Sequence, residues 1–475
     1  MSEISAIPRP LCVDLDGTLV KSDTLFDALW LLVRRQPGQL WRLPFWLARG
    51  RAGLKIEVAS RAPLDTSRLP YNTALLRFLQ AEHRAGRRLY LATGADGAVA
   101  TRVAAHLGIF EDVLASDGVT NLVHASKLAS IESRFGSFDY VGNSTADLPV
   151  LARARAAMVA NPTRGLLVAM RMKRIPVAQM FLDRRPLFRS VLKAIRIHQW
   201  AKNLLLAVPL LLSHDLRPGP MAAAVAAFFC FSFMASANYL VNDMLDIESD
   251  RRHPAKRFRP FASGDLSVAS GMALSFLLAL ASLAVLPLLD RAFAFWLLAY
   301  ILATGAYSFT LKRIAIVDVL VLSGLYTLRM LAGGAATGTV ISPWLAGFSS
   351  FLFLSLAMVK RFSEIENLRE RGGAKAHGRG YLVADLEQIR AFGTASAYAA
   401  VMVFSLYITR PDVDALYTHP NRLWFIVPLL VYWLNRVWLL ASRGELDDDP
   451  VIFAIRDRIS LGVGIGVVVT AIFAL

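Results

Sequence analysis

Asp14 and Asp16 lie two residues apart in LCVDLDGT, where an apolar run ends. Alternate residues at the end of an extended strand point to one side, so both carboxylates can face a single pocket. One of two adjacent carboxylates can act as a nucleophile and the other as a general acid and base. The pattern suggests chemistry on a small polar group, held where a buried strand ends.

A second group of acids lies in NDMLDIESDRRHPAKRFRPFASG, residues 242–264, between two apolar stretches. Asn242, Asp246 and Asp250 are four residues apart, so a helix would stack them on one face. Oxygen ligands arranged in this way suit Mg²⁺, which commonly shares its coordination shell with substrate phosphates. Charge this dense beside a membrane is costly unless it is paired or functional, which argues against a simple solvated loop.

The composition indicates which elements must position these acids. The 475 residues are 55% hydrophobic and only 19% charged, whereas a soluble protein carries charge on about a quarter of its residues. Residues 1–165 read as a soluble domain, 166–197 as a basic amphipathic connector, and 198–475 as a series of apolar stretches. Each stretch has the roughly 17–25 residues that span a bilayer. The sequence therefore predicts two domains, one of them embedded in a membrane.

The apolar half is expected to be an all-α, multi-pass domain of about nine helices, with basic connections on the cytoplasmic side. The net charge of +16 is explained by these connections, so nucleic acid is not an expected partner. Two cysteines, Cys12 and Cys230, predict neither a disulfide framework nor a metal cluster. The N-terminus lacks the pattern of a cleaved signal peptide, so the soluble domain is expected in the cytoplasm. The predicted spans are 198–213, 219–241, 268–289, 291–310, 315–334, 343–361, 388–409, 421–441 and 451–475.

The run of acids after the second predicted span, followed by the basic segment, resembles the UbiA superfamily of intramembrane prenyltransferases. DRRHPAKRFRPFASG, HQWAKN at 198–203 and KRFSE at 360–364 are most similar to the branch that makes polyprenyl-phosphate phosphoribose. The resemblance implies that Asp243 and Asp246 are catalytic. It also implies that Mg²⁺, one ion or more, is held by Asn242, Asp243, Asp246 and Asp250.

The same resemblance implies a second acidic site at Asp318, with Arg329 three turns further along one helical face. The chain departs from the aromatic prenyltransferases here, because Leu322 stands where a second acid would complete a pair. Residues 369–381 are expected to form a mobile cytoplasmic loop, from which Arg379 and Tyr381 could close over the donor. The residues expected to bind the substrates and their phosphates are Lys202, Asn203, Lys256, Arg257, Arg259, Lys312, Asp318, Arg329, Lys360 and Arg361.

Four motifs in the soluble half resemble the haloacid dehalogenase phosphohydrolases: DLDGT, a threonine, a lysine and GNSTAD. The resemblance implies a doubly wound α/β fold, with Asp14 as nucleophile and Asp16 as general acid and base. It implies that Thr93, Lys127 and Asn143 bind the substrate phosphate. Mg²⁺ would be held by Asp14, the backbone carbonyl of Asp16, and Asp147. Asn143 stands where many relatives have aspartate, and residues 24–75 read as a small helical cap or as helices resting on the membrane.

Taken together, the sequence predicts a bifunctional, Mg²⁺-dependent enzyme of the inner membrane with both active sites on the cytoplasmic side. It would transfer 5-phosphoribose from phosphoribosyl pyrophosphate to a polyprenyl phosphate in the bilayer, and the soluble domain would then remove the 5-phosphate. One alternative is an aromatic prenyltransferase that uses a prenyl diphosphate, with a separate or regulatory soluble domain. A second alternative is a non-catalytic membrane scaffold. The protein could also form an oligomer.

Overall fold

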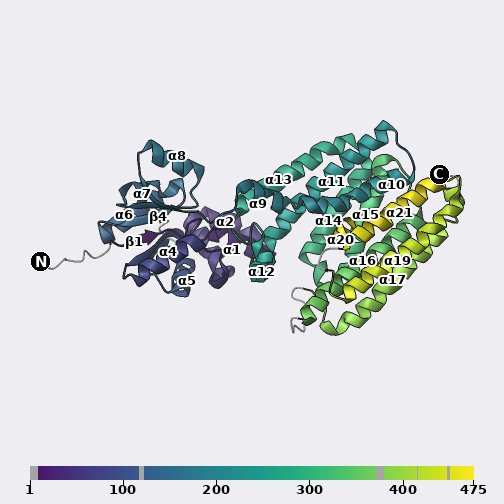
Figure 1. Ribbon diagram of the computed structural model, residues 1–475. Helices are drawn as coiled ribbons and strands as arrows, with labels where there is room; N and C mark the ends of the chain where they lie inside the picture. The colour runs from purple at the N-terminus through teal and green to yellow at the C-terminus, as the bar shows by residue number, and fades with distance from the viewer. Residues whose placement is uncertain (1–8, 117–121, 371–378, 415, 447–449) are drawn as a thin grey trace. The chain divides into compact units, whose positions relative to one another are not determined.

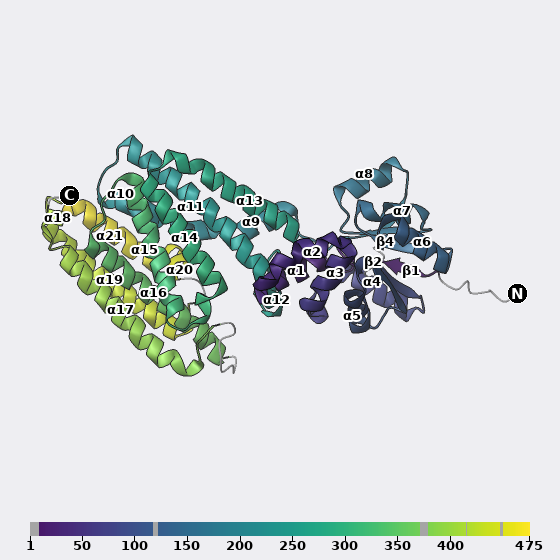
Figure 2. The same cartoon turned by 180° about the vertical axis from the view of Figure 1, so that it is seen from behind.

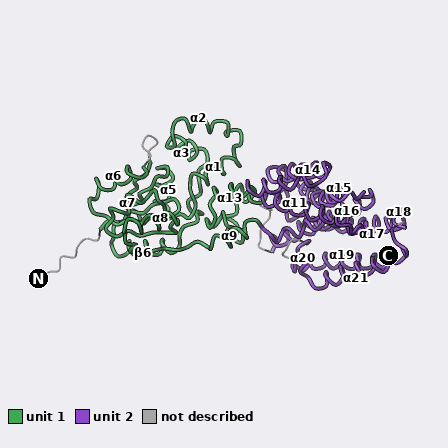
Figure 3. Tube along the Cα trace, turned by 90° about the horizontal axis from the view of Figure 1, so that it is seen from above, with its two compact units in different colours: residues 1–195, 239–275 green, residues 196–238, 276–475 purple. Residues whose placement is uncertain are grey.

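The computed structural model describes residues 9–116, 122–370, 379–414, 416–446 and 450–475 (Figure 1). The chain forms two compact units, shown in different colours in Figure 3. The first unit contains residues 1–195 and 239–275, and the second contains residues 196–238 and 276–475. The acidic segment 242–250 therefore belongs to the same unit as the soluble α/β domain.

Six parallel strands form the sheet of the first unit, in the order β3-β2-β1-β4-β5-β6. This is the order of a doubly wound fold, in which ligands bind at the carboxyl ends of the strands beside the point where the order reverses. Here that point lies between β1 and β4. The strands are β1 (Leu11–Val13), β2 (Leu89–Asp96), β3 (Asp112–Ser116), β4 (Asp139–Gly142), β5 (Ala157–Ala160) and β6 (Val177–Phe181).

Helices cover both faces of this sheet, with α4 and α5 on one side and α6 and α7 on the other (Figures 1 and 2). Leu11 and Val13 pack in one hydrophobic cluster, while Cys12 between them packs in another. This alternation follows from the period of two along a strand, and it explains why β1 is apolar at every position. The helices are α4 (Thr73–Arg84), α5 (Gly97–Leu107), α6 (His124–Phe135), α7 (Leu148–Arg153) and α8 (Arg164–Met172).

A helical insertion follows β1 and precedes α4. It contains α1 (Thr24–Arg35), a 3₁₀ helix (Pro37–Arg42), α2 (Leu43–Ala48) and α3 (Gly50–Arg61). Residues of α1 and α3 line the cavity at the end of β1. The insertion therefore lies where the predicted cap would lie.

Residues 166–197 differ from the expected amphipathic connector. Most of helix α8 and the whole of β6 lie within this range, and β6 pairs with β5 as the last strand of the sheet. Leu166 and Met170 of α8 are buried in the core under β5. Only α9 (Leu187–Ile195) keeps the expected character, with Leu187 and Phe188 exposed beside basic residues.

The helical half has seven helices long and apolar enough to cross a membrane within the described residues, or eight if one bent pair is a single span. The predicted number of nine is not confirmed. The first predicted span, 198–213, is a 3₁₀ helix (Ile197–Ala207) followed by only five residues of α10 (Val208–Leu212). The bent pair, α20 (Pro450–Arg456) and α21 (Arg458–Ala474), turns by 82°. Apolar content alone does not reveal such breaks, because they depend on local backbone geometry.

Most of the remaining helices of this half are long, with α12 and α18 as short exceptions, and α15, α16 and α17 pack as consecutive neighbours. Tyr326 of α15 stacks on Phe353 of α16 with ring centroids 4.8 Å apart. The helices are α11 (Pro218–Leu245), α12 (Ile247–Arg252), α13 (Val268–Val285), α14 (Arg291–Phe309), α15 (Val317–Thr337), α16 (Pro343–Glu370), α17 (Leu386–Tyr407), α18 (Pro411–Asp414) and α19 (Ile426–Ser442).

Candidate active sites

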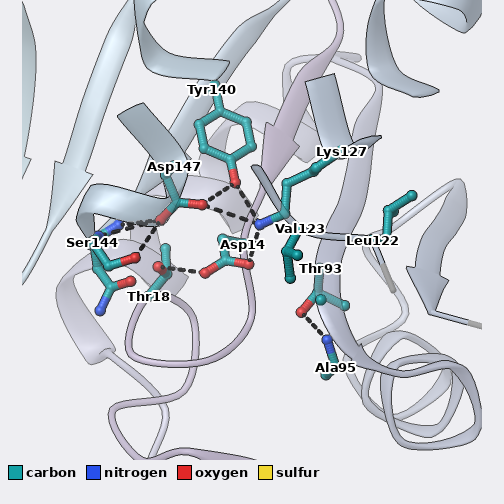
Figure 4. Close-up of polar contacts among 12 residues, drawn as sticks. Asp14, Thr18, Thr93, Ala95, Leu122, Val123, Lys127, Tyr140, Ser144 and Asp147 are labelled. Carbon is teal, nitrogen blue, oxygen red and sulfur yellow. Dashed lines mark hydrogen bonds and ion pairs between the residues drawn. The ribbon is translucent and has the colours of Figure 1, made fainter. Parts of the chain in front are cut away.

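Lys127 lies at the centre of the candidate site in the α/β domain (Figure 4). Its Nζ lies 2.9 Å from Asp14 Oδ1 and 3.1 Å from Asp147 Oδ1. Asp14 follows β1, Asp147 follows β4, and Lys127 comes from α6. Neighbouring parallel strands bring residues more than a hundred positions apart to one edge of the sheet. The structure therefore joins three of the predicted residues directly.

Tyr140 of β4 belongs to the same cluster, although the sequence analysis did not single it out. Its hydroxyl donates to Asp147 Oδ1 at 2.8 Å and accepts a hydrogen bond from Lys127 Nζ at 3.0 Å. The side chain is fully buried. The sequence could have indicated this role, because Tyr140 lies in a largely apolar strand and a buried tyrosine hydroxyl usually has a polar partner.

Burial and charge act in opposite directions on the two carboxylates. Burial raises the pKa of Asp14 to about 6, even though Lys127 opposes the shift. Burial also disfavours the charge on Asp147, but Lys127 and the Tyr140 hydroxyl lower its pKa below the usual value. Two carboxylates around one ammonium leave negative charge uncompensated, which a divalent cation would balance.

The main chain around Asp16 gives a physical reason for the spacing of residues in DLDGT. Asp16 Oδ1 accepts a hydrogen bond of 2.8 Å from the backbone N–H of Thr24, the first residue of α1. Burial raises the pKa of Asp16 well above its usual value, which suits a group that must carry a proton. Gly17 has φ of +75°, and a Cβ there would lie 2.1 Å from Asn143 Nδ2, so only glycine fits.

A cavity of about 500 Å³ contains all six predicted residues of this site. They are Asp14, Asp16, Thr93, Lys127, Asn143 and Asp147. The cap contributes Lys55, and the rim includes Arg184 and Ser267. Asp14, Asp147 and the Asp16 carbonyl provide the oxygen ligands that Mg²⁺ prefers, so these residues fit the predicted ion.

The acidic segment after α11 is neutralised by arginines. Arg259 Nη1 lies 3.2 Å from Asp243 Oδ1 and 2.8 Å from Asp250 Oδ2, so one guanidinium bridges two buried carboxylates. Asp246 Oδ1 lies 2.8 Å from Arg34 Nη1, which comes from the cap. The Asn242 side chain donates to Asp246 at 3.3 Å. Burial raises the pKa of Asp250 to about 6 against the effect of Arg259.

The oxygen atoms of Asn242, Asp243, Asp246 and Asp250 are of the type that Mg²⁺ prefers. The Arg259 guanidinium between Asp243 and Asp250 shows that positive charge is stabilised at this position. Among the described residues, no three carboxylate, histidine or cysteine side chains form a ready metal cluster. Mg²⁺ does not require one, because it usually retains waters and binds one or two carboxylates together with substrate phosphates. The predicted ligand set of Asn242, Asp243, Asp246 and Asp250 therefore stays a prediction.

Asp318, in the second unit, is fully buried at the start of α15 among cationic and phenolic groups. Arg361 Nη2 of α16 lies 2.7 Å from its carboxylate, and Arg379 Nη1 lies 3.4 Å away. Tyr381 donates a hydrogen bond to the same carboxylate. Burial raises the pKa of Tyr381, and the hydrogen bond to the Asp318 carboxylate raises it further. Arg379 and Tyr381 thus lie at the second acidic site, whereas residues 371–378 of their loop are outside the described residues.

The backbone just before Asp318 is strained. Ile316 has φ of +66°, in a region that β-branched residues rarely occupy, and its N–H donates to the Tyr381 hydroxyl at 2.8 Å. Strain of this kind persists only where the surroundings impose it, and it is concentrated at functional sites. Its position supports a functional role for this cluster.

A second buried group in this unit surrounds Arg329. Its Nε donates to Asn203 Oδ1 at 2.9 Å, and its guanidinium lies 5.0 Å from the Tyr300 ring centroid. Lys202 lies 5.6 Å above the ring of Tyr326, which Arg329 also faces. Three predicted substrate-binding residues, Lys202, Asn203 and Arg329, are therefore neighbours although 126 positions separate two of them.

The other predicted phosphate-binding residues lie on further elements of the chain. Lys256 and Arg257 are exposed in a 3₁₀ helix (Lys256–Phe258), where Arg257 lies over the Phe258 ring. Lys312 lies in another 3₁₀ helix (Leu311–Arg313), and Lys360 is half-buried on α16. Their roles remain predictions.

Comparison with known proteins agrees with this division into two domains. Residues 204–456 match the UbiA prenyltransferase family, and residues 11–152 match the haloacid dehalogenase-like hydrolases. The chain is 37% identical over 462 residues to the protein y4nM of Sinorhizobium fredii, covering 96% of this chain and 89% of that one. It is 34% identical over 279 residues to the decaprenyl-phosphate phosphoribosyltransferase of Mycobacterium tuberculosis, covering 58% and 90%. The structure of a UbiA homolog from Archaeoglobus fulgidus bound to GPP and Mg²⁺ covers 59% of this chain and 99% of that one, with 16% identity and a TM-score of 0.45.

Proposed function

Because the chain belongs to the UbiA prenyltransferase family and carries an N-terminal haloacid dehalogenase-like domain, we propose that it is a bifunctional lipid phosphoribosyltransferase and phosphatase. The membrane domain transfers 5-phosphoribose from phosphoribosyl pyrophosphate to a polyprenyl phosphate. The soluble domain then removes the 5-phosphate from the lipid product. The similarity to the mycobacterial decaprenyl-phosphate phosphoribosyltransferase supports the choice of transferred group.

The observation that carries the proposal is the environment of Asp318. Arg361 and Arg379 both lie near its carboxylate, and both also lie near the carboxylate of Glu364, so two cations face two acids here. Leu322, one turn further along α15, packs against the hydrophobic core of this unit and supplies no second carboxylate. Without that second carboxylate the site has no pair of acids one turn apart to hold a second metal ion, which supports a donor other than a prenyl diphosphate.

In the transfer step, an oxygen of the lipid phosphate attacks the anomeric carbon of the ribose. A new carbon–oxygen bond forms while the bond from that carbon to the diphosphate breaks, and diphosphate leaves with the bonding electrons. Asp243, Asp246 and Asp250 would hold a divalent cation, and that cation would offset charge on the leaving diphosphate. The lipid phosphate is already an anion near neutral pH, so the protein mainly orients the reactants and stabilises charge.

In the phosphatase step, Asp14 attacks the phosphorus of the 5-phosphate and forms an aspartyl phosphate. Asp16 donates its proton to the departing ribose oxygen, then accepts a proton from the water that hydrolyses the aspartyl phosphate. Lys127 and Thr93 bind the phosphoryl oxygens. The raised pKa of Asp16 keeps a proton available for the first half of this cycle.

The rim of the phosphatase cavity supports a lipid-linked substrate. Ser267 lines this cavity and directly precedes α13, one of the helices apolar enough to cross a membrane. Gly264 packs so closely on Lys21 that a Cβ would lie 2.7 Å from the lysine Cβ. The lining of the cavity thus includes the residue just before a helix apolar enough to cross a membrane, which suits a substrate anchored in the bilayer.

The proposal is tested by incubating the purified full-length protein with polyprenyl phosphate, Mg²⁺ and labelled phosphoribosyl pyrophosphate, followed by mass spectrometry of the lipid. The wild type should produce polyprenylphosphoryl ribose, and Asp14→Asn should accumulate the form that is heavier by one phosphate. Transfer of a prenyl group from prenyl diphosphate to an aromatic acceptor, without ribosylated lipid, would overturn the transferase assignment. Release of only the phosphorylated lipid by the wild type would overturn the assignment of the phosphatase substrate.

A further inference from the structure

The carboxyl end of cap helix α1 contacts the acidic segment of the transferase. Besides its ion pair with Asp246, Arg34 Nη1 donates to the Leu245 carbonyl at 3.1 Å. Arg35, the next residue, pairs with Glu248 at 2.9 Å. Both arginines belong to the phosphatase domain, whereas both acids follow membrane helix α11. Residues of the cap therefore supply cations to the acidic segment that follows α11, within the same compact unit.

A buried ion pair anchors the same helix nearer its amino end. Arg251 Nη2 lies 2.7 Å from Asp27 Oδ2, and both side chains are almost completely buried. The same nitrogen donates to Ser22 Oγ at 3.1 Å, and Arg251 Nε donates to the Ala262 carbonyl at 3.1 Å. Removing one partner of such a pair leaves an uncompensated buried charge, so this contact is expected to persist.

Arg34 differs from this anchor because its contact is partly open to solvent. The exposed fractions of the Arg34 and Asp246 side chains are 25% and 16%, against 6% and 1% for Arg251 and Asp27. A pair that is partly solvated can exchange partners at low cost. The carboxylate oxygen that Arg34 contacts is also one that a divalent cation would require.

The amino end of α1 reaches the phosphatase site. The backbone N–H of Thr24, its first residue, donates to Asp16 Oδ1, and Asp23 caps the helix. Twelve residues of α-helix extend about 18 Å. A single helix thus has the general acid of one site at its start and a predicted metal ligand of the other site at its end.

We propose that Arg34 is a positioning residue of the transferase site, contributed by the phosphatase cap, that competes with the divalent cation for Asp246. Without the cation, Arg34 holds the carboxylate in place. When the cation binds, Arg34 is released, and the end of α1 loses a contact while Arg251 keeps the helix attached. The assignment of Asp246 as a metal ligand rests on the proposed function.

The first test measures Mn²⁺ binding to the full-length protein by electron paramagnetic resonance, with no donor or lipid substrate present. Asp14→Asn identifies the signal of the phosphatase ion. Arg34→Ala should tighten binding at the other site about threefold to tenfold, because a competing charge is removed. Arg34→Lys should return the affinity towards that of the wild type. Arg35→Ala is the matched control, since it removes a neighbouring arginine from Glu248 only, and it should leave the affinity unchanged.

The second test requires no variant. Hydrogen exchange of the wild type should accelerate at the last turn of α1 when Mg²⁺ is added, while the amides around Asp27 keep their protection. Equal Mn²⁺ affinities for Arg34→Ala and Arg35→Ala, or no change in exchange at α1, would overturn the competition. If Asp246→Asn does not weaken Mn²⁺ binding, Asp246 is not a ligand and the inference fails at its premise. Absence of ribosylated lipid despite these metal effects would instead count against the proposed donor.

Discussion

Replacing Asp14 by asparagine should make the α/β domain more stable in the absence of Mg²⁺, although it removes the predicted nucleophile. The side chain is buried beside Asp147, and burial raises its pKa from 3.8 to about 6. A carboxylate whose pKa is raised by folding destabilises the folded state once it is ionised. Asparagine retains the shape without the charge, and Lys127 keeps its ion pair with Asp147.

The size of the effect follows from the pKa shift. A rise in pKa from 3.8 to about 6, at 1.36 kcal/mol per pKa unit, corresponds to about 3 kcal/mol. The penalty is absent below pH 3.8, grows as pH rises towards 6, and is complete above it. Asp14→Asn should therefore stabilise the domain by about 3 kcal/mol at pH 7.5 and by about half of that at pH 5.

Hydrogen exchange of the slowest amides in β1 and β4 is the appropriate assay, because it reports the opening free energy of one domain in a two-domain chain. The measurements are made in EDTA between pH 5 and pH 8. Asp112→Asn serves as a control of opposite sign. A backbone hydrogen bond from Val113 and the Arg134 side chain lower the pKa of Asp112. Its ionised form therefore stabilises the fold, and the benefit is lost as pH falls through the lowered pKa.

Two results would refute this reasoning. Asp14→Asn could destabilise the domain at pH 7.5, which would mean that the Lys127–Asp14 pair outweighs the cost of burying the carboxylate. Alternatively, the stabilisation could be the same at pH 5 and pH 8, which would mean that it does not arise from ionisation of Asp14.

Three further substitutions probe the other contacts. Asp243→Asn should abolish lipid phosphoribosylation while leaving membrane insertion intact, because a ligand charge is lost without a change of shape; near-normal ribosylated lipid would contradict the metal assignment. Tyr140→Phe should lower phosphatase kcat about 10- to 100-fold through loss of the hydrogen bond to Asp147, and unchanged hydrolysis would show that the phenol only fills space. Asp318→Asn leaves Arg361 without its buried partner, so the thermal midpoint of the purified protein should fall by several degrees; Asp318→Asn with Arg361→Gln should recover part of it.

Several features were readable from the sequence because they depend on local pattern. Apolar strands ending in DLDGT and GNSTAD predicted the doubly wound domain, and all six predicted residues line one cavity. Long apolar stretches predicted a multi-pass helical domain, since only a closed hydrogen-bonding pattern can cross a bilayer. In each case the signal lies in residue type at fixed spacing along a single segment.

Other features depended on distant segments and could not be read in this way. The sequence does not identify the partners of the Tyr140 hydroxyl. Only the structure shows that this hydroxyl lies within hydrogen-bonding distance of Lys127 and Asp147. The 198–213 stretch is apolar enough for a span, yet it folds as a 3₁₀ helix and one short α-helix.

The contact between Arg34 and Asp246 joins residues 212 positions apart, one in the cap and one after α11. No local sequence pattern identifies which acid will form an ion pair with a basic residue at the end of a cap helix. Spacing within a segment determines which side chains share a face, but only the packing of segments decides which charges meet. The predicted catalytic acids could therefore be identified from the sequence, whereas the tertiary structure decides which cationic side chains form ion pairs with them.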